Sequence, residues 1–88
     1  MTEDKIKAKC EEISDLLIRK NWDYGNSVFN PVGIFSKAPP IEALKVRIDD
    51  KLSRIASSGE KNFKEDTLLD LTGYLILLII ALEGEHDR

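Results

Sequence analysis

The stretch EDTLLDLTGYLILLIIAL, residues 65–82, is apolar around nearly its whole circumference when it is wound as an α-helix. Two carboxylates, Asp66 and Asp70, nevertheless lie on one line of that helix. A helix that is apolar on every side is normally buried on every side. Two other helices and a loop in a chain of 88 residues cannot cover so much surface. The stretch therefore predicts a homo-oligomer in which this helix is central.

Apolar residues at helical spacing and proline and glycine signals predict two more helices before this one. The first apolar stripe consists of Ile6, Cys10, Ile13 and Leu17. Pro39 and Pro40 predict the start of the next helix, because proline suits a first helical turn. The expected helices cover about residues 2–20, 40–57 and 63–83. We therefore expect an all-α fold, with one three-helix domain over residues 1–88.

The connection over residues 21–39 contains too many glycines, prolines and asparagines for regular structure. It is also rich in large apolar side chains, namely Trp22, Tyr24, Val28, Phe29, Val32, Ile34 and Phe35. A solvated linker is not normally so apolar. We expect an ordered loop that packs on the helices and shapes a pocket.

Composition excludes several classes of protein. The net charge is −3 and no dense Lys/Arg cluster is present, so general nucleic-acid binding is not expected. Cys10 is the only cysteine, which rules out a disulfide within one chain. The N-terminal sequence MTEDKIKAKCEE lacks the pattern of a secretion signal, so we expect the chain in the cytoplasm. The uninterrupted apolar run Tyr74–Leu82 is shorter than the roughly 20 residues of a membrane span, and no membrane contact is expected.

The second expected helix carries a charged stripe beside its apolar face. Its members are Arg47, Asp50, Lys51 and Arg54. Because an unpaired buried carboxylate costs several kcal/mol, Asp66 and Asp70 each need a cation, a metal or several hydrogen bonds. The cations that the sequence offers are Arg47, Lys51 and Arg54, and we expect the two carboxylates to meet this stripe. These pairs either set the register of two helices or, as a mixed cluster of cations and anions, suit an anionic ligand.

The loop adds two flat surfaces, Trp22 and Tyr24, on which a nucleobase could stack unless they merely fill the core. They lie beside Gly25 and Asn26, where we expect a turn with free backbone donors.

Three motifs resemble those of the nucleotide modification associated domain family of phage and bacterial genomes. They are DYG at residues 23–25, R-x-x-D-K-x-x-R at residues 47–54, and E-D-x-x-x-D-L-x-G-Y at residues 65–74. The resemblance spans roughly residues 16–82. It implies an all-helical fold, a link to nucleotide metabolism and DNA base modification in phages, and a nucleotide-type ligand. The residues to which it points are Asp23, Tyr24, Gly25, Arg47, Asp50, Lys51, Arg54, Asp66, Asp70 and Tyr74.

The chain is more loosely similar to the MazG-like all-helical nucleotide pyrophosphatases, which hold magnesium with carboxylates from two adjacent helices. It departs from their E-x-x-E pair. Asp49 and Asp50 are adjacent and point about 100° apart, and Arg47 and Arg54 stand where more carboxylates would help. A site rich in arginine favours phosphate binding over a metal cluster.

Three functional hypotheses follow. The first is a phage-type, oligomeric nucleotide-binding protein that needs no cofactor and either sequesters a nucleotide signal of host defence or serves nucleotide and DNA modification. Its candidate ligand-binding residues are Trp22, Asp23, Tyr24, Gly25, Asn26, Arg47, Asp50, Lys51, Arg54, Asp66, Asp70 and Tyr74. The second is a hydrolase whose Mg²⁺ is held by Asp50, Glu65, Asp66 and Asp70. The third is an interaction protein without a ligand. No catalytic residue is assigned.

Overall fold

The computed structural model describes residues 1–58 and 64–86 of the chain. These residues form three α-helices and no strand, which confirms the all-α class: α1 (Thr2–Asp23), α2 (Pro40–Ser58) and α3 (Glu65–His86). Helix α1 runs three residues past its predicted end, and α3 continues to His86. The predicted start of the third helix at residue 63 lies outside the described residues.

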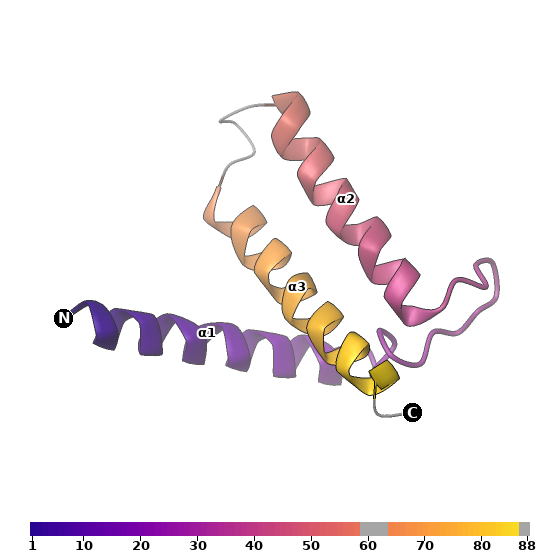
Figure 1. Ribbon diagram of the computed structural model, residues 1–88, viewed down its shortest axis with the longest axis horizontal. Coiled ribbons are helices and arrows are strands. Elements are labelled where there is room, and N and C mark those ends of the chain that lie inside the picture. Colours follow the sequence, from indigo (N-terminus) through magenta and orange to yellow (C-terminus); the bar gives the residue numbers. More distant parts are fainter. Residues whose placement is uncertain (59–63, 87–88) are drawn as a thin grey trace.

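Helices α2 and α3 lie side by side, whereas α1 crosses α3 only with its C-terminal half (Figure 1). The N-terminal half of α1 projects away from the other helices (Figure 1). Lys9 still reaches α3, because its Nζ lies 3.7 Å from Oε1 of Glu65. The crossing leaves a hollow between α1 and α3, and this hollow holds the site described below.

The core within one chain is small. Among the described residues, Leu44 and Ile48 of α2 are the buried hydrophobic side chains. Gly73 of α3 is also buried. A Cβ atom built at Gly73 would lie 2.7 Å from Cδ2 of Leu17, so the glycine allows α1 to approach α3 closely.

Many large apolar side chains are exposed in the single chain. The connection between α1 and α2 packs on the helices only in part, because Val28 and Phe29 are half-buried while Val32, Ile34 and Phe35 are exposed. The expected packing of the whole loop is therefore not observed. Cys10 is exposed as well, since the α1 stripe continues beyond the region that α3 covers.

Within the described residues, one segment is long and apolar enough to cross a membrane by length and composition alone. This segment is Glu65–Gly84 of α3, and only 6% of it is buried inside the chain. A core helix of a soluble protein passes the same test, so the finding is weak evidence for a membrane span. Five large apolar side chains of α3, Leu68, Leu75, Ile79, Ile80 and Leu82, are exposed in the single chain.

Candidate functional site

The central pocket is the hollow between α1 and α3, closed on one side by α2. The cavity has a volume of about 160 Å³ and opens to solvent, so it is smaller than the roughly 300–1,000 Å³ of typical small-molecule sites. Its polar and aromatic lining consists of Lys20, Asn21, Tyr24, Arg47, Asp70 and Tyr74. Its apolar lining consists of Ile13, Leu16, Leu17, Val28, Leu69, Gly73 and Leu77. An apolar floor with a few convergent polar groups is the usual composition of a ligand pocket.

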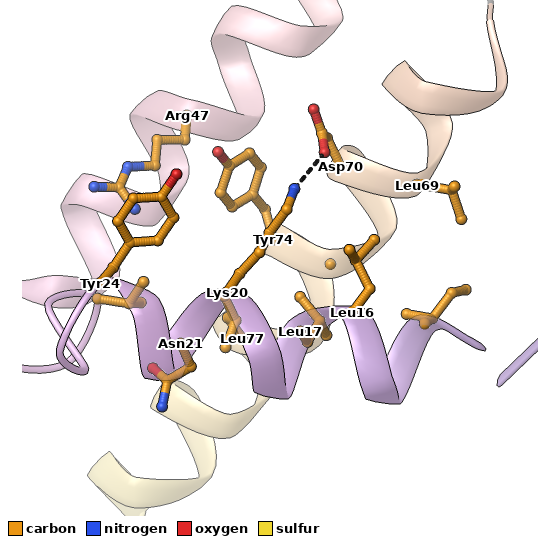
Figure 2. A pocket seen from close by; sticks show the side chains of 13 residues that line it. Leu16, Leu17, Lys20, Asn21, Tyr24, Arg47, Leu69, Asp70, Tyr74 and Leu77 are labelled. Carbon is orange, nitrogen blue, oxygen red and sulfur yellow. Dashed lines mark hydrogen bonds and ion pairs between the residues drawn. The ribbon is translucent and has the colours of Figure 1, made fainter. Parts of the chain in front are cut away.

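At one end of the central pocket, Asp70 lies between two lysines from different helices. The Nζ of Lys51 on α2 donates to Oδ2 of Asp70 at 3.1 Å, and the Nζ of Lys20 on α1 donates to Oδ1 at 3.2 Å. Figure 2 shows the Lys20 bond as a dashed line. Asp70 thus ties α1 and α2 to α3 with one carboxylate. This is the kind of partnership that a carboxylate on an apolar helix requires.

Partial burial raises the pKa of Asp70, but the hydrogen bonds and charges of Lys51 and Lys20 outweigh it. The pKa of Asp70 therefore lies below its ordinary value of 3.8. Asp70 stays ionised at neutral pH, and one of its two ammonium partners, Lys20, lines the pocket.

At the other side of the pocket, Arg47 and two tyrosines come together (Figure 2). The Cζ atom of Arg47 lies 6.0 Å from the centroid of the Tyr74 ring, a distance at which a guanidinium is attracted to an aromatic face. Tyr24, at the end of α1, is exposed and presents its ring to the same opening. The three side chains come from three helices or helix ends. The fold, and no single motif, assembles this cluster.

Asp70 pairs with one of the three cations expected for it, Lys51, and with Lys20 of α1, which was not expected. Arg47 instead lies over Tyr74. Asp66 is exposed one turn before Asp70. The physical reason is the way α1 crosses α3. The crossing brings Lys20 of α1 to Asp70 and leaves the Arg47 guanidinium at the pocket opening.

Of the sequence-predicted site residues, Tyr24, Arg47, Asp70 and Tyr74 line the central pocket, and Lys51 adjoins it through Asp70. The predicted residues that do not line it are Trp22, Asp23, Gly25, Asn26, Asp50, Arg54 and Asp66. The backbone N–H groups of Gly25 and Asn26 are not free, since they donate to the carbonyls of Trp22 and Asn21 at 3.2 and 3.0 Å. These bonds end α1, so the expected donor-rich turn serves as a helix cap.

The carboxylates of the hydrolase hypothesis are not gathered within one chain. In the part of the chain that the structure describes, no three His, Cys, Asp or Glu side chains lie close enough to hold a metal ion. Glu65 faces Lys9, and Asp70 is occupied by two lysines.

Sequence reasoning missed Lys20, Asn21 and Val28 as lining residues. The sequence did contain a signal for Lys20. The spacing from Ile13 to Leu17, Lys20 and Tyr24 is four, three and four residues, which continues the apolar stripe of α1 past the predicted helix end. Lys20 and Tyr24 therefore lie on the face of α1 that packs against α3.

Comparison with models of known protein families gives no match, and none is found among curated proteins or solved structures. The site must therefore be interpreted from its own chemistry.

The Asp70 bridge predicts a pH dependence of stability. Because the folded-state pKa of Asp70 is lowered, its stabilisation is present above the ordinary carboxyl pKa and is lost as the pH falls through the folded value. We expect Asp70→Asn to lower the melting temperature at pH 7, and we expect this difference to disappear at an acidic pH below the folded-state pKa of Asp70, where the wild-type carboxylate is also neutral. Thermal unfolding followed by circular dichroism at both pH values measures this difference.

The control for this prediction is Glu42→Gln, which removes an exposed pair with Lys45 on one helix. Exposed pairs contribute about 0–1 kcal/mol, so this variant should melt close to wild type at both pH values. An Asp70→Asn protein that melts like wild type at pH 7 would show that the bridge does not hold the helices together.

Proposed function

We propose that this protein binds a phosphorylated nucleotide in the central pocket and holds it without cleaving it. The observation that carries the proposal is the convergence of Arg47, Tyr24 and Tyr74 over an apolar floor. A nucleobase needs a flat apolar surface and an aromatic ring to stack on, and stacking contributes about 1–3 kcal/mol per base. A phosphate needs cations, and arginine is the side chain best shaped to bind it.

The charge of the cluster supports an anionic ligand. Lys20, Lys51 and Arg47 provide three positive charges, and Asp70 provides one negative charge. The excess of cations beside the pocket complements the charge of a nucleoside phosphate. Asn21 offers an amide that can both donate to and accept from the edge of a base.

Holding the ligand is favoured over cleaving it because the described residues show no cluster of metal-ligating side chains. The one carboxylate that lines the pocket is engaged by two lysines, so it is poorly placed to bind a divalent cation as well. In the phage setting that the sequence motifs resemble, such a protein would withhold a nucleotide signal from host defence or supply a nucleotide modification pathway.

The binding unit in this proposal is a homo-oligomer built on α3. Four of the exposed apolar side chains of α3, together with Thr72, recur at alternating spacings of four and three residues, the pattern of a helix that packs against another helix. These residues, the α3 stripe, are Leu68, Thr72, Leu75, Ile79 and Leu82. The Thr72 hydroxyl donates to the carbonyl of Leu68 at 2.7 Å, so it brings no unpaired donor to the stripe.

The exposed area supports the same proposal. The chain exposes 7075 Å², whereas a folded monomer of 10.0 kDa exposes about 5,200 Å². The excess of roughly 1,800 Å² exceeds the roughly 800 Å² that each partner buries in a typical stable interface. The excess area that a single chain exposes is therefore larger than the area that one partner buries in a typical interface.

The test is incubation of the pure protein with a panel of linear and cyclic nucleotides, with and without Mg²⁺, followed by ultrafiltration. We expect one nucleotide to disappear from the filtrate in both conditions and to return intact after heat denaturation. Trp22, the only tryptophan, is exposed two residues before Tyr24 and provides a fluorescence signal for titrating that nucleotide.

Two other results would contradict the proposal. A cleaved product that forms only with Mg²⁺ would establish the hydrolase and imply that carboxylates converge between chains. A filtrate in which every nucleotide stays at its starting concentration would favour an interaction protein whose charged cluster only fixes helix packing.

A further inference from the structure

A second hollow, the end pocket, lies where the connection between α1 and α2 meets the last turns of α3. The described residues that form its wall are Phe29, Pro39, Pro40, Ile41, Ile80, Ala81 and Gly84, and none of these is charged. Figure 1 shows this corner, where the connection swings out from the C-terminal end of α3. The end pocket does not share a lining residue with the central pocket, so the nucleotide proposed above does not account for it.

The same connection carries an apolar projection, the loop tip, at residues 32–35. Val32 is 76% exposed, Ile34 is 71% exposed and Phe35 is fully exposed. Three adjacent apolar side chains held out in this way mark an interaction surface. Among the described residues, Phe35 is the most exposed large apolar side chain.

Local hydrogen bonds hold the loop tip away from the end pocket of its own chain. Gly33 has a φ of 69°, a left-handed conformation that suits glycine and turns the chain at the tip. The Nζ of Lys37 donates to the carbonyl of Gly33, and the N–H of Ala38 donates to the Ser36 hydroxyl at 3.1 Å. The tip is thus a formed projection, and Phe29 and Pro39, on either side of it in the chain, belong to the pocket wall.

We propose that the end pocket receives the loop tip of a second copy of this chain. Both surfaces are apolar, and because each chain carries both, two copies can exchange tips in a self-complementary contact. The charges beside the surfaces are complementary. Lys37 follows the tip, whereas the exposed carboxylates Glu42 and Glu83 adjoin pocket residues Ile41 and Gly84 in the sequence. The C-terminal end of α3, which forms part of the wall, also favours a cation nearby.

This contact is separate from the α3 stripe and from nucleotide binding, so it is tested in the Ile79→Glu background, in which the α3 stripe should no longer join two chains. Phe35→Ala removes the largest side chain of the tip. Gly84→Trp fills the pocket, and a Cβ atom at Gly84 meets open space, so α3 tolerates the substitution. We expect each variant to raise the dissociation constant for self-association at least tenfold by analytical ultracentrifugation. Trp22→Ala, which removes an equally exposed aromatic side chain elsewhere, should leave it unchanged.

An equimolar mixture of Phe35→Ala and Gly84→Trp gives the decisive result. Only a mixed pair brings an intact tip to an open pocket, so the mixture should associate more tightly than either variant alone. Equal circular dichroism spectra of all variants will show that folding is intact. A zero-length carbodiimide cross-link between Lys37 and Glu83 or Glu42 of isotopically different copies is the second expected result.

Association that is no tighter in the mixture would overturn the proposal, as would a Phe35→Ala protein that associates like its Ile79→Glu parent. Lys37 cross-links found only within one chain would instead assign the tip to its own pocket.

Discussion

Arg47→Ala should weaken nucleotide binding by about 10- to 100-fold while the helices remain folded. Arg47 is the only arginine that lines the central pocket, and it lies at the opening over Tyr74. A hydrogen bond to a charged group contributes about 1.5–3 kcal/mol, and each 1.4 kcal/mol corresponds to a tenfold change in affinity. Because Arg47 is exposed, its removal leaves no buried charge without a partner. Isothermal titration with the nucleotide identified in the panel measures the change, with circular dichroism to follow the fold.

The matched control for Arg47→Ala is Lys45→Ala. Lys45 lies on the same helix two residues earlier, pairs with Glu42 at 3.3 Å and does not line the pocket. Its removal should leave the affinity within about twofold of wild type, since exposed charges outside a site contribute little. Arg47→Lys should be intermediate, because it keeps the charge and loses the planar fork. Equal losses in the two alanine variants would mean that net charge alone attracts the ligand and that no defined site exists.

Asp70 shows which part of the site could be predicted from the sequence and which part could not. The need for a partner followed from one carboxylate on an apolar helix, and the structure provides two cations. Which cations they are depends on the angle at which α1 crosses α3. Helical periodicity places residues on faces but does not specify how two helices cross. Lys20, for which no role was expected, consequently pairs with Asp70 where Arg47 was a candidate, and Lys51 is the candidate cation that does pair with Asp70.

The helices themselves were predictable because apolar spacing and proline and glycine signals agree along the chain. The end of α1 was the main discrepancy. Asn21, Trp22 and Asp23 read as the start of a loop, yet the cap occurs at Gly25 and Asn26, where φ is 61° and 60°. Because α1 ends three residues later than predicted, Tyr24 lies on the side of α1 that faces α3. Tyr24 can therefore line the pocket beside Arg47 and Tyr74. Trp22, two positions earlier, points elsewhere and is exposed.

Leu75→Glu and Ile79→Glu should each remove association through the α3 stripe and lower the mass of the protein at micromolar concentration. These residues lie in the middle of the α3 stripe and are 43% and 55% exposed in the single chain. A carboxylate placed in a tightly packed apolar interface costs several kcal/mol when it has no partner, so association should weaken by more than 100-fold. Multi-angle light scattering on wild type and both variants measures the mass. Wild type should scatter as a multimer.

Ile18→Glu separates interface loss from a general effect of added charge. Ile18 is 67% exposed on α1, about 100° around the helix from Leu17 of the apolar stripe, and the same substitution there should leave the mass unchanged. A monomeric wild type, or Ile79→Glu with the wild-type mass, would show that another surface covers α3.

A lipid bilayer is the main alternative cover for α3, and wild-type protein that sediments with lipid vesicles would support it. Asp70 opposes a bilayer, because the ion pairs that it makes with Lys20 and Lys51 would place three charges at membrane depth, where each costs about 2.5–3.5 kcal/mol. The α3 stripe lies on the side of α3 opposite Asp70. A second protein chain would therefore cover the stripe without moving those three charges out of water.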